Sequence, residues 1–243
     1  MLHHAKCQIV PTDKIQFVFV TVLFYDIWPK IMLRSLRRYF DNEIIMVNHL
    51  SKPVPKEYYD DNCTIIDNKD AHNNNGHGAG IDVAVKYLRE RGDRYFVHIE
   101  PDCVFTGTAW IAEMLDAMVN NAIMAGPCRL PFGPIHPCPT IWDIVKIPGS
   151  FDISFRQCLI DFNIFNYRLM LDWLINTGMD EGSIWLWCHM WDCGIKNWYM
   201  AALQGKAVHT RNDDGYKHFF GGRGYPPTKL LECDYKLVEE YLY

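Results

Sequence analysis

The sequence predicts an α/β protein, with an open and mostly parallel sheet flanked by helices. Short β-branched and aromatic runs alternate with segments of helical periodicity along the first half of the chain. Several runs are apolar throughout, which is typical of strands buried on both faces. With 243 residues and 49% hydrophobic residues, the chain can fill a sizeable core, and we expect residues 1–243 to form a single domain.

The first predicted strand covers Gln16–Phe24, where β-branched and aromatic residues dominate. Pro29 then suits the first turn of a helix, because proline lacks an amide hydrogen that this position would leave unpaired. Two further strands are predicted at Glu43–Asn48 and Cys63–Asp67, and both end in a polar residue.

A loop rich in asparagine and glycine, residues 73–80, precedes a predicted helix with Val85 and Leu88 on one face. Glycines let the backbone approach a ligand closely, and the amides of a helix start can receive an anion such as a diphosphate. We therefore interpret the loop, with Gly76 and His77, as a candidate nucleotide-binding site. The same composition is also typical of plain turns, and the loop does not match the G-x-G-x-x-G fingerprint, so both interpretations stay open.

The predicted strand Tyr95–Ile99 ends in two acids separated by one proline, Glu100-Pro101-Asp102. Packing does not readily explain them, because ionised groups are seldom buried unless they are paired or bind a metal. Side chains two residues apart in an extended segment share a face, so His98, Glu100 and Asp102 can point the same way. Such ligands suit a hard cation such as Mg2+ or Mn2+. The alternative is an ordinary strand end in which Glu100 is solvated and Asp102 closes a turn.

A helix over about Thr108–Asn121 and a strand at Ala122–Gly126 continue the alternation. The pattern then changes, because prolines and aromatic residues crowd residues 127–160. Connections this long within a compact domain tend to be functional, so we interpret this segment as a wall that holds a second substrate.

A predicted helix over about Asn163–Thr177 is followed by a cluster of tryptophans and one acid, Asp192. Aromatic rings stack on the apolar faces of sugars, and a nearby carboxylate can take a proton from a hydroxyl. Asp192 also stands where an N-cap would begin the next predicted helix, so base and cap both remain open. The tryptophans are Trp185, Trp187 and Trp191.

The chain is predicted to end with a strand at Lys206–Thr210, a loop at Tyr216–Arg223 and a helix at about Asp234–Leu242. His218 lies in that loop, near a pair of glycines. Histidine is a common metal ligand, which makes His218 a candidate third ligand for a cation.

The net charge of −5 and the scattered basic residues give no electrostatic footprint for nucleic acid, which is therefore a poor candidate partner. The longest apolar run, Phe17–Tyr25, is too short to cross a bilayer, and the N-terminus lacks the pattern of a signal peptide. The nine cysteines include no C-x-x-C pair and are typical of buried thiols in a reducing compartment. We expect a soluble cytoplasmic protein without a stable membrane span.

In combination, three motifs resemble those of the GT-A nucleotide-sugar glycosyltransferases, in the broad group similar to family 2. The first, His77-Gly78-Ala79-Gly80-Ile81-Asp82, resembles the H-G-x-x-L-D element that precedes the metal motif in some of these enzymes. Glu100-Pro101-Asp102 resembles their D-x-D motif, and residues 216–222 resemble a late histidine loop that closes over the diphosphate. The resemblance extends from Phe17 to Arg223 and implies a single GT-A, Rossmann-like domain with a C-terminal acceptor-side subregion.

The resemblance implies transfer of a sugar from a nucleotide-diphosphate sugar to a hydroxyl of a glycan or glycoconjugate acceptor. About residues 14–126 would bind the donor, and about 127–243 would bind the acceptor and close the site. Asp102 would hold a divalent cation, Mn2+ or Mg2+, that bridges the donor phosphates, with Glu100 assisting through metal, water or ribose and His218 as a further ligand. Base and ribose contacts would fall to Thr21, Tyr25, Asn48, Asp67 and Asp82.

By the same resemblance, Asp192 would deprotonate the acceptor hydroxyl, which gives inversion at the sugar carbon by direct displacement. Two departures from the family pattern matter. Glu100 replaces the usual first aspartate, which leaves a metal-independent variant open. The usual E-D pair at the base is missing, because Asp192 follows Trp191, and this leaves retention of configuration open.

Two other functions remain open. His98, Glu100 and Asp102 can serve as ligands in a metal-dependent hydrolase that acts on a phosphoester or nucleotide and needs no acceptor. The tryptophans of residues 185–191 can instead form the platform of a carbohydrate-binding module, which would bind glycan without any nucleotide.

Overall fold

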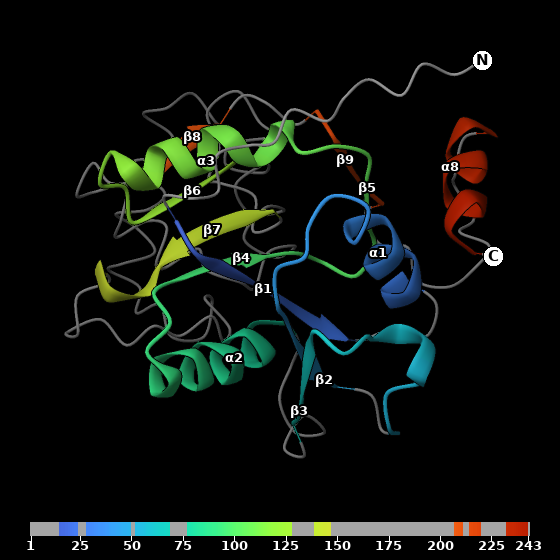
Figure 1. The fold of residues 1–243 in the computed structure, drawn as a ribbon, viewed down its shortest axis with the longest axis horizontal. Coiled ribbons are helices and arrows are strands. Elements are labelled where there is room, and N and C mark those ends of the chain that lie inside the picture. The colour runs from blue at the N-terminus through green and yellow to red at the C-terminus, as the bar shows by residue number, and fades with distance from the viewer. Residues whose placement is uncertain are drawn as a thin grey trace, which may run out of the picture.

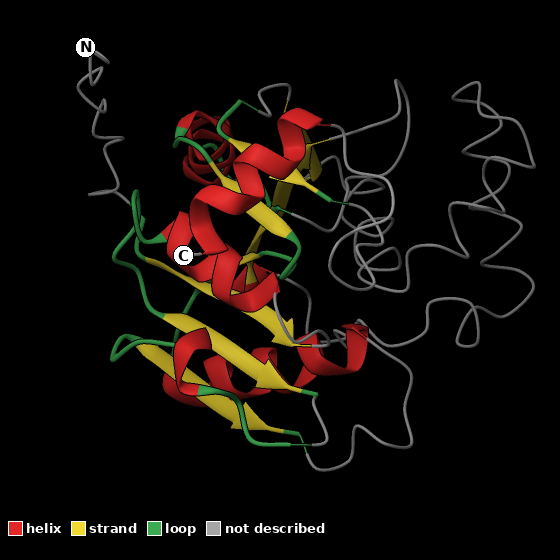
Figure 2. Cartoon of the chain, turned by 90° about the vertical axis from the view of Figure 1, so that its right-hand side faces the viewer, coloured by secondary structure: helices red, strands yellow, loops and turns green. Residues whose placement is uncertain are grey.

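The computed structural model describes residues 15–23, 28–49, 52–68, 77–127, 139–146, 207–210, 214–219 and 232–242. In these residues the chain forms an α/β fold, with a seven-stranded sheet between helices and a small two-stranded sheet beside it (Figure 1, Figure 2). Most of the strand pairs in the large sheet are parallel, which confirms the predicted fold class.

Four parallel strands form one half of the large sheet: β1 (Phe17–Leu23), β2 (Ile44–Asn48), β3 (Cys63–Asp67) and β4 (Tyr95–His98). β1 is buried at every position, and the sequence predicts this for all of its residues except the polar Thr21. The chain adds β2 and β3 on one side of β1 and β4 on the other, so the strand order reverses between β1 and β4. In open α/β sheets, ligands bind beyond the carboxyl ends of the strands at such a reversal.

Three more strands complete this sheet: β6 (Met124–Pro127), β7 (Thr140–Asp143) and β8 (Ala207–Thr210). The full order is β3-β2-β1-β4-β7-β6-β8, and β7 runs antiparallel to both of its neighbours. The sequence does not predict β7, which lies inside the segment interpreted as a substrate-binding wall. Its Trp142 stacks on Phe96 of β4, with ring centroids 6.4 Å apart, so this part of the segment belongs to the sheet.

The described residues include four α-helices: α1 (Trp28–Leu36), α2 (His77–Arg91), α3 (Ala109–Val119) and α8 (Glu232–Leu242). Pro29 lies in the first turn of α1, as predicted. α1 and α3 lie on one face of the large sheet, and α2 packs against β1 and β2 on the other (Figure 1). Two short 3-10 helices are also present, at Lys56–Tyr58 and Ile144–Lys146.

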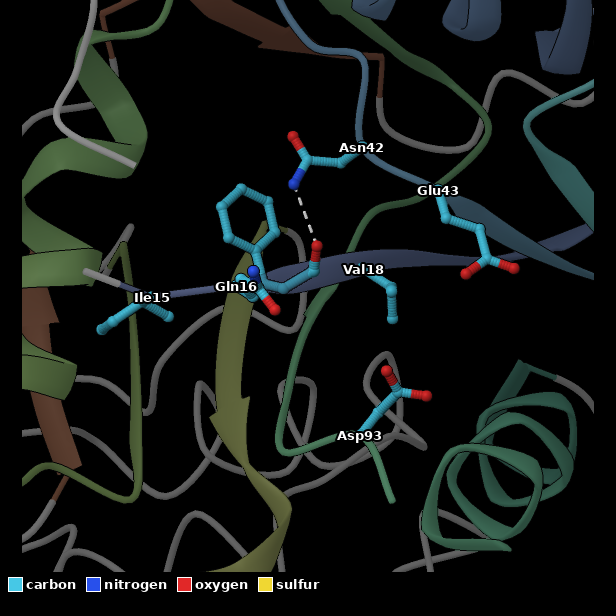
Figure 3. A pocket seen from close by; sticks show the side chains of 7 residues that line it. Ile15, Gln16, Val18, Asn42, Glu43 and Asp93 are labelled. Carbon is cyan, nitrogen blue, oxygen red and sulfur yellow. Dashed lines mark hydrogen bonds between the residues drawn. The ribbon is translucent and has the colours of Figure 1, made fainter. Parts of the chain in front are cut away.

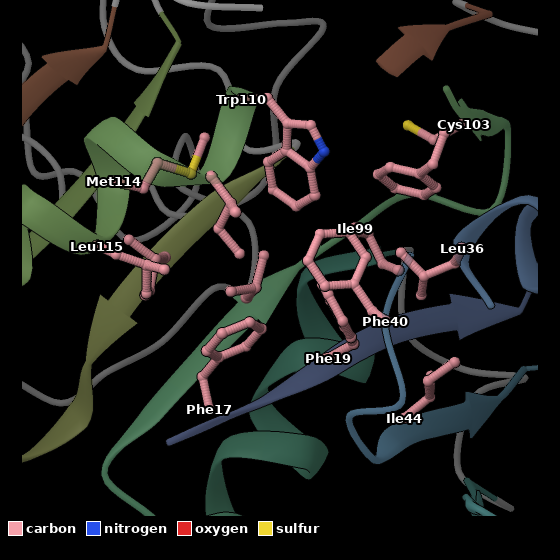
Figure 4. Packing of buried hydrophobic residues seen from close by; sticks show 14 of the residues in the cluster. Phe17, Phe19, Leu36, Phe40, Ile44, Ile99, Cys103, Trp110, Met114 and Leu115 are labelled. Carbon is pink, nitrogen blue, oxygen red and sulfur yellow. The ribbon is translucent and has the colours of Figure 1, made fainter. Parts of the chain in front are cut away.

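Aromatic rings fill the core between the sheet and the helices α1 and α3 (Figure 4). Phe19 packs edge-on against Phe17 and Phe40, with ring centroids 5.3 and 5.4 Å apart. Phe40 in turn packs edge-on against Trp110 at 5.8 Å. All four side chains are buried, and burying one such side chain contributes about 1.5–3 kcal/mol. This cluster therefore fixes the strands whose ends carry the candidate site.

A second, two-stranded sheet pairs β5 (Cys103–Phe105) with β9 (Tyr216–His218) in antiparallel orientation. The predicted loop at Tyr216–Arg223 is therefore wrong over residues 216–218, which form a strand. This sheet packs against α1 and α8 through a separate apolar cluster. Its buried members are Trp28, Ile31, Val104, Phe219, Val238 and Tyr241.

Some predicted boundaries shift. The loop predicted over residues 73–80 is wrong at its end, because α2 already begins at His77. β6 begins at Met124 rather than at Ala122. The helix predicted at Asn163–Thr177 and the one after Asp192 lie outside the described residues. In the part of the chain that the structure describes, no helix has the length and apolarity needed to cross a membrane.

Candidate functional site

The carboxyl ends of β1, β2 and β3 lie in register at one edge of the sheet, where Leu23 pairs with Asn48 and Asn48 with Asp67. β4 ends close by, because the Ile99 N–H donates to a carbonyl oxygen of β1 at 2.9 Å. The chain then continues into residues 100–102, which we call the acidic turn. Several predicted polar residues thus meet at the edge where parallel sheets bind ligands.

The acidic turn connects β4 to β5. The Cys103 N–H donates to the carbonyl oxygen of Glu100 at 3.2 Å and closes the turn. Asp102 is only 7% exposed and Glu100 is partly buried. Both residues interact with other parts of the protein. Because these surroundings screen charge less than water does, a cation bound here would be attracted more strongly than at the surface.

Strand pairing brings a second candidate segment to the acidic turn. In the β5–β9 ladder, Cys103 pairs with His218, and the Phe219 N–H donates to the carbonyl oxygen of Asp102 at 2.9 Å. The backbones of Asp102 and His218, which are far apart in the sequence, therefore lie next to each other. The imidazole of His218 is not among the described side chains.

The side chains of Glu100, Asp102 and His218 are of the chemical types that bind a hard divalent cation, because carboxylate oxygens and an imidazole nitrogen both suit Mn2+. Among the side chains that the structure describes, no three from His, Cys, Asp and Glu form a group able to hold a metal ion. His98, Glu100 and Asp102 are all described, and these three do not form such a group. His98 is 1% exposed, which places it inside the fold.

Asn48 and Asp67 are in contact at the ends of β2 and β3. The Asn48 side-chain amide donates to Asp67 Oδ1 at 2.9 Å and to the carbonyl oxygen of Lys52 at 3.2 Å. Asn48 is buried, whereas Asp67 is exposed. Thr21 lies deeper in the sheet: it has no exposed surface, and its hydroxyl has no hydrogen-bond partner in the described part of the chain. Asp67 is thus accessible to a base or ribose, and the assignment of Thr21 stays a prediction.

The first turn of α2 lies against the ends of β1 and β2. A Cβ atom on Gly80 would stand 2.5 and 2.7 Å from the methyl carbons of Val22 and 2.9 Å from His49 Nε2, so glycine permits this close approach. The first amides of a helix have no partner within the helix and favour an anion. α2 thus presents its first turn, which begins at His77, at the same edge as Asn48.

Other predicted site residues are not described. Tyr25, Gly76 and Asp192 lie outside the described residues, as do the tryptophans of residues 185–191. For His77 and Asp82, the structure gives the backbone, within α2, but not the side chain. The roles assigned to these residues stay predictions.

An open hollow of about 460 Å3 lies at the opposite edge, near the amino end of β1 (Figure 3). Its lining includes Glu43 and Asp93, and Arg91 forms an ion pair of 2.7 Å with each. The hydrogen bond from Arg91 holds the pKa of Glu43 below its usual value. Both carboxylates are thus paired with Arg91, and ligands of such sheets bind at the other edge. We therefore do not propose a binding site in this hollow.

Sequence reasoning misses the two glycines that lie against each other beside the β5–β9 ladder. Gly215 has a φ of +99°, and a Cβ atom on it would stand 2.8 Å from the carbonyl carbon of Gly107. The pair Asp214-Gly215 is a turn signal in the sequence. It does not reveal the partner segment, because β5 lies far away along the chain.

No protein-family model matches the chain, and no curated protein matches it. Solved structures do match it, among them the two that follow, whose similarity is limited. A cytidylyltransferase from Leptospira borgpetersenii serovar Hardjo-bovis is 9% identical with a TM-score of 0.43, and the match covers 82% of this chain and 77% of that one. A197 from STIV is 10% identical with a TM-score of 0.37, and the match covers 63% of this chain and 77% of that one. Likenesses of this strength carry no argument about activity.

Proposed function

We propose that this protein is a glycosyltransferase that moves a sugar from a nucleotide-diphosphate sugar to a hydroxyl of a glycan or glycoconjugate. One observation carries the proposal. The acidic turn follows β4 at the strand-order reversal of an α/β sheet, and the β5–β9 ladder pairs His218 with the residue next to that turn. The resemblance of the three motifs supports the same activity. In this proposal a divalent cation, Mn2+ or Mg2+, assists the reaction.

Asp102 and Glu100 would supply oxygen ligands to the cation, and His218 would supply a nitrogen. When bound, the cation would offset the negative charge that develops on the departing nucleoside diphosphate. The low exposure of Asp102 supports its role as the main ligand, because a carboxylate shielded from water attracts a cation more strongly. Glu100 is more exposed and has the longer side chain, so contact through water or ribose is also compatible with its position.

The amides in the first turn of α2 would receive the diphosphate. The absence of a side chain at Gly80 supports this role, since it keeps that turn against the ends of β1 and β2. The exposed Asp67 would accept hydrogen bonds from the hydroxyls of the ribose, while its contact with the Asn48 amide fixes one carboxylate oxygen. Donor phosphates and ribose would thus lie along one sheet edge.

Asp192 would accept the proton of the acceptor hydroxyl as the hydroxyl oxygen attacks the sugar carbon. The bond from that carbon to the diphosphate breaks, and its electron pair leaves with the phosphate oxygen. Attack from the face opposite the leaving group gives inversion. The tryptophans of residues 185–191 would hold the acceptor sugar by stacking.

The test is a thermal-shift panel of nucleoside diphosphates, with and without Mn2+. A ligand present at 100 times its dissociation constant stabilises the folded state by roughly 2.7 kcal/mol. We expect one nucleoside diphosphate to stabilise the wild-type protein only when Mn2+ is present, and Asp102→Asn to abolish that stabilisation. Asp192→Asn should keep the stabilisation and lose sugar transfer.

Two results would contradict the proposal: no nucleoside diphosphate stabilises the protein, or Asp102→Asn responds like the wild type. A protein that is stabilised by glycan alone would be a carbohydrate-binding module. Full transfer activity in Asp192→Asn would leave the activity standing but would refute Asp192 as the base.

A further inference from the structure

β9 is held to the first part of the fold at both of its ends. Before the strand, the carbonyl oxygen of Gly215 accepts hydrogen bonds from the N–H groups of Thr106 and Gly107, at 2.7 and 2.9 Å. After the strand, the Phe219 N–H donates to the carbonyl oxygen of Asp102 at 2.9 Å. The ladder between these points fixes the register of β9 over its whole length.

The first point of attachment depends on the absence of a side chain. The φ of Gly215 is +99°, a backbone conformation that other residues adopt with strain. A Cβ atom on Gly215 would also stand 2.8, 3.0 and 3.1 Å from the carbonyl carbon, the Cα and the oxygen of Gly107. These are backbone atoms, which cannot move aside as the end of a long side chain can.

The second point of attachment depends on an aromatic ring. Phe219 is 6% exposed and stacks on Trp28 of α1, with ring centroids 5.2 Å apart and an angle of 26° between the ring planes. The same apolar cluster includes Val238 and Tyr241 of α8. Phe219 is therefore anchored from two helices, and it directly follows His218 in the chain.

We infer that Gly215 and Phe219 are positioning residues that hold His218 in register with the acidic turn and so set the affinity of that turn for a divalent cation. The inference rests on the proposed function, because it takes His218 as a ligand. A side chain at residue 215 would push β9 away from Gly107, and His218 would move with the strand. Loss of groups that orient a metal ligand typically costs 10–100-fold in metal affinity.

The experiment measures Mn2+ binding to the purified full chain without any substrate, from the electron paramagnetic resonance signal of free Mn2+. We expect Gly215→Ala to weaken Mn2+ binding about tenfold. The matched control is Gly92→Ala. Gly92 also has a positive φ, +84°, but a Cβ atom on it would meet nothing within 4 Å. The control carries similar backbone strain without the clash, so it should bind Mn2+ like the wild type.

A double variant separates positioning from general damage to the fold. If Gly215 acts through His218, then Gly215→Ala should have no further effect on Mn2+ affinity once His218→Ala is present. If Gly215→Ala lowers the Mn2+ affinity by the same factor in the wild type and in His218→Ala, the inference is overturned. Mn2+ binding that is unchanged in Gly215→Ala would overturn it as well. Should Gly215→Ala fail to fold, Phe219→Leu decides. It keeps an apolar side chain but loses the stacking on Trp28, so Mn2+ binding equal to that of the wild type would overturn the inference.

The wild-type protein distinguishes the inference from the proposed function. Wild-type protein that binds no Mn2+ would refute the metal site itself, and the positioning role with it. Wild-type protein that binds Mn2+, together with variants that bind it equally well, would refute only the role of Gly215 and Phe219.

Discussion

The contact between α2 and β1 gives a prediction whose size follows from interatomic distances. In Gly80→Ala, the new Cβ atom would overlap the two methyl carbons of Val22, at 2.5 and 2.7 Å, and would touch His49 Nε2 at 2.9 Å. The imidazole can move at the cost of its 3.1 Å hydrogen bond with the side-chain amide of Asn68. Val22 cannot, because it is fully buried.

Two effects of opposite sign decide the outcome. Alanine is favoured over glycine by about 1 kcal/mol in a helix interior, and by less in a first turn. Overpacking a filled core costs about 1–3 kcal/mol. We therefore expect Gly80→Ala to lower the free energy of unfolding by about 1 kcal/mol. Val22→Ala alone should lower it by about 2 kcal/mol, because two buried methyl groups are lost.

The double variant tests the mechanism directly. In Gly80→Ala with Val22→Ala, the new methyl group occupies the space that the valine leaves, so the combined loss should be about 2 kcal/mol rather than the sum of about 3 kcal/mol. Urea denaturation followed by circular dichroism measures all three variants. Losses that add to within about 0.5 kcal/mol, or a Gly80→Ala variant more stable than the wild type, would refute the steric argument.

Two more predictions concern charged side chains. The buried carboxylate of Asp143 pairs with Arg94 at 2.9 Å and with Lys146 at 3.3 Å. Arg94→Met removes the closer partner and should lower the free energy of unfolding by about 2 kcal/mol. A loss below about 0.5 kcal/mol in urea denaturation would contradict this. Arg91 holds the pKa of Glu43 below its ordinary value of 4.5, so the stabilisation from this pair is present above that value and is lost as the pH falls through the lowered pKa. Glu43→Gln should therefore lose less stability than the wild type when urea denaturation is repeated at decreasing pH, and equal slopes would contradict this.

The elements that the sequence predicts well carry a recognisable pattern within their own residues. β1 is apolar at every position except Thr21, and α1 begins at a tryptophan followed by Pro29. β5, β7 and β9 are short, and each takes its place by pairing with a segment distant in the sequence. Three residues carry too little periodicity to predict β5 or β9, and β7 lies in a segment crowded with prolines, so these strands become visible only once the partner is in place.

In the candidate site, too, some features can be predicted from the local sequence and others depend on strand pairing. Acids after a buried strand can be predicted to lie at the edge of the sheet, and the acidic turn does lie there. The sequence also places Asn48 and Asp67 at strand ends, but their hydrogen bond depends on the register of β2 against β3. Burial of Thr21 could not be predicted from its polar side chain. The closeness of Gly107 and Gly215 depends on the β5–β9 pairing and has no local signal.

Strand pairing also bears on how the chain divides into a donor half and an acceptor half. We predict this division of roles at about residue 126, but the described strands beyond it do not form a sheet of their own. β7 fills the place between β4 and β6, β8 extends the sheet from β6, and β9 pairs with β5. The acidic turn therefore lies between two strands, β4 and β5, whose partners β7 and β9 come from the second half of the chain. A change in the second half that disturbs either pairing is transmitted to the acidic turn through backbone hydrogen bonds, so the two halves share one structural site whichever substrate each of them binds.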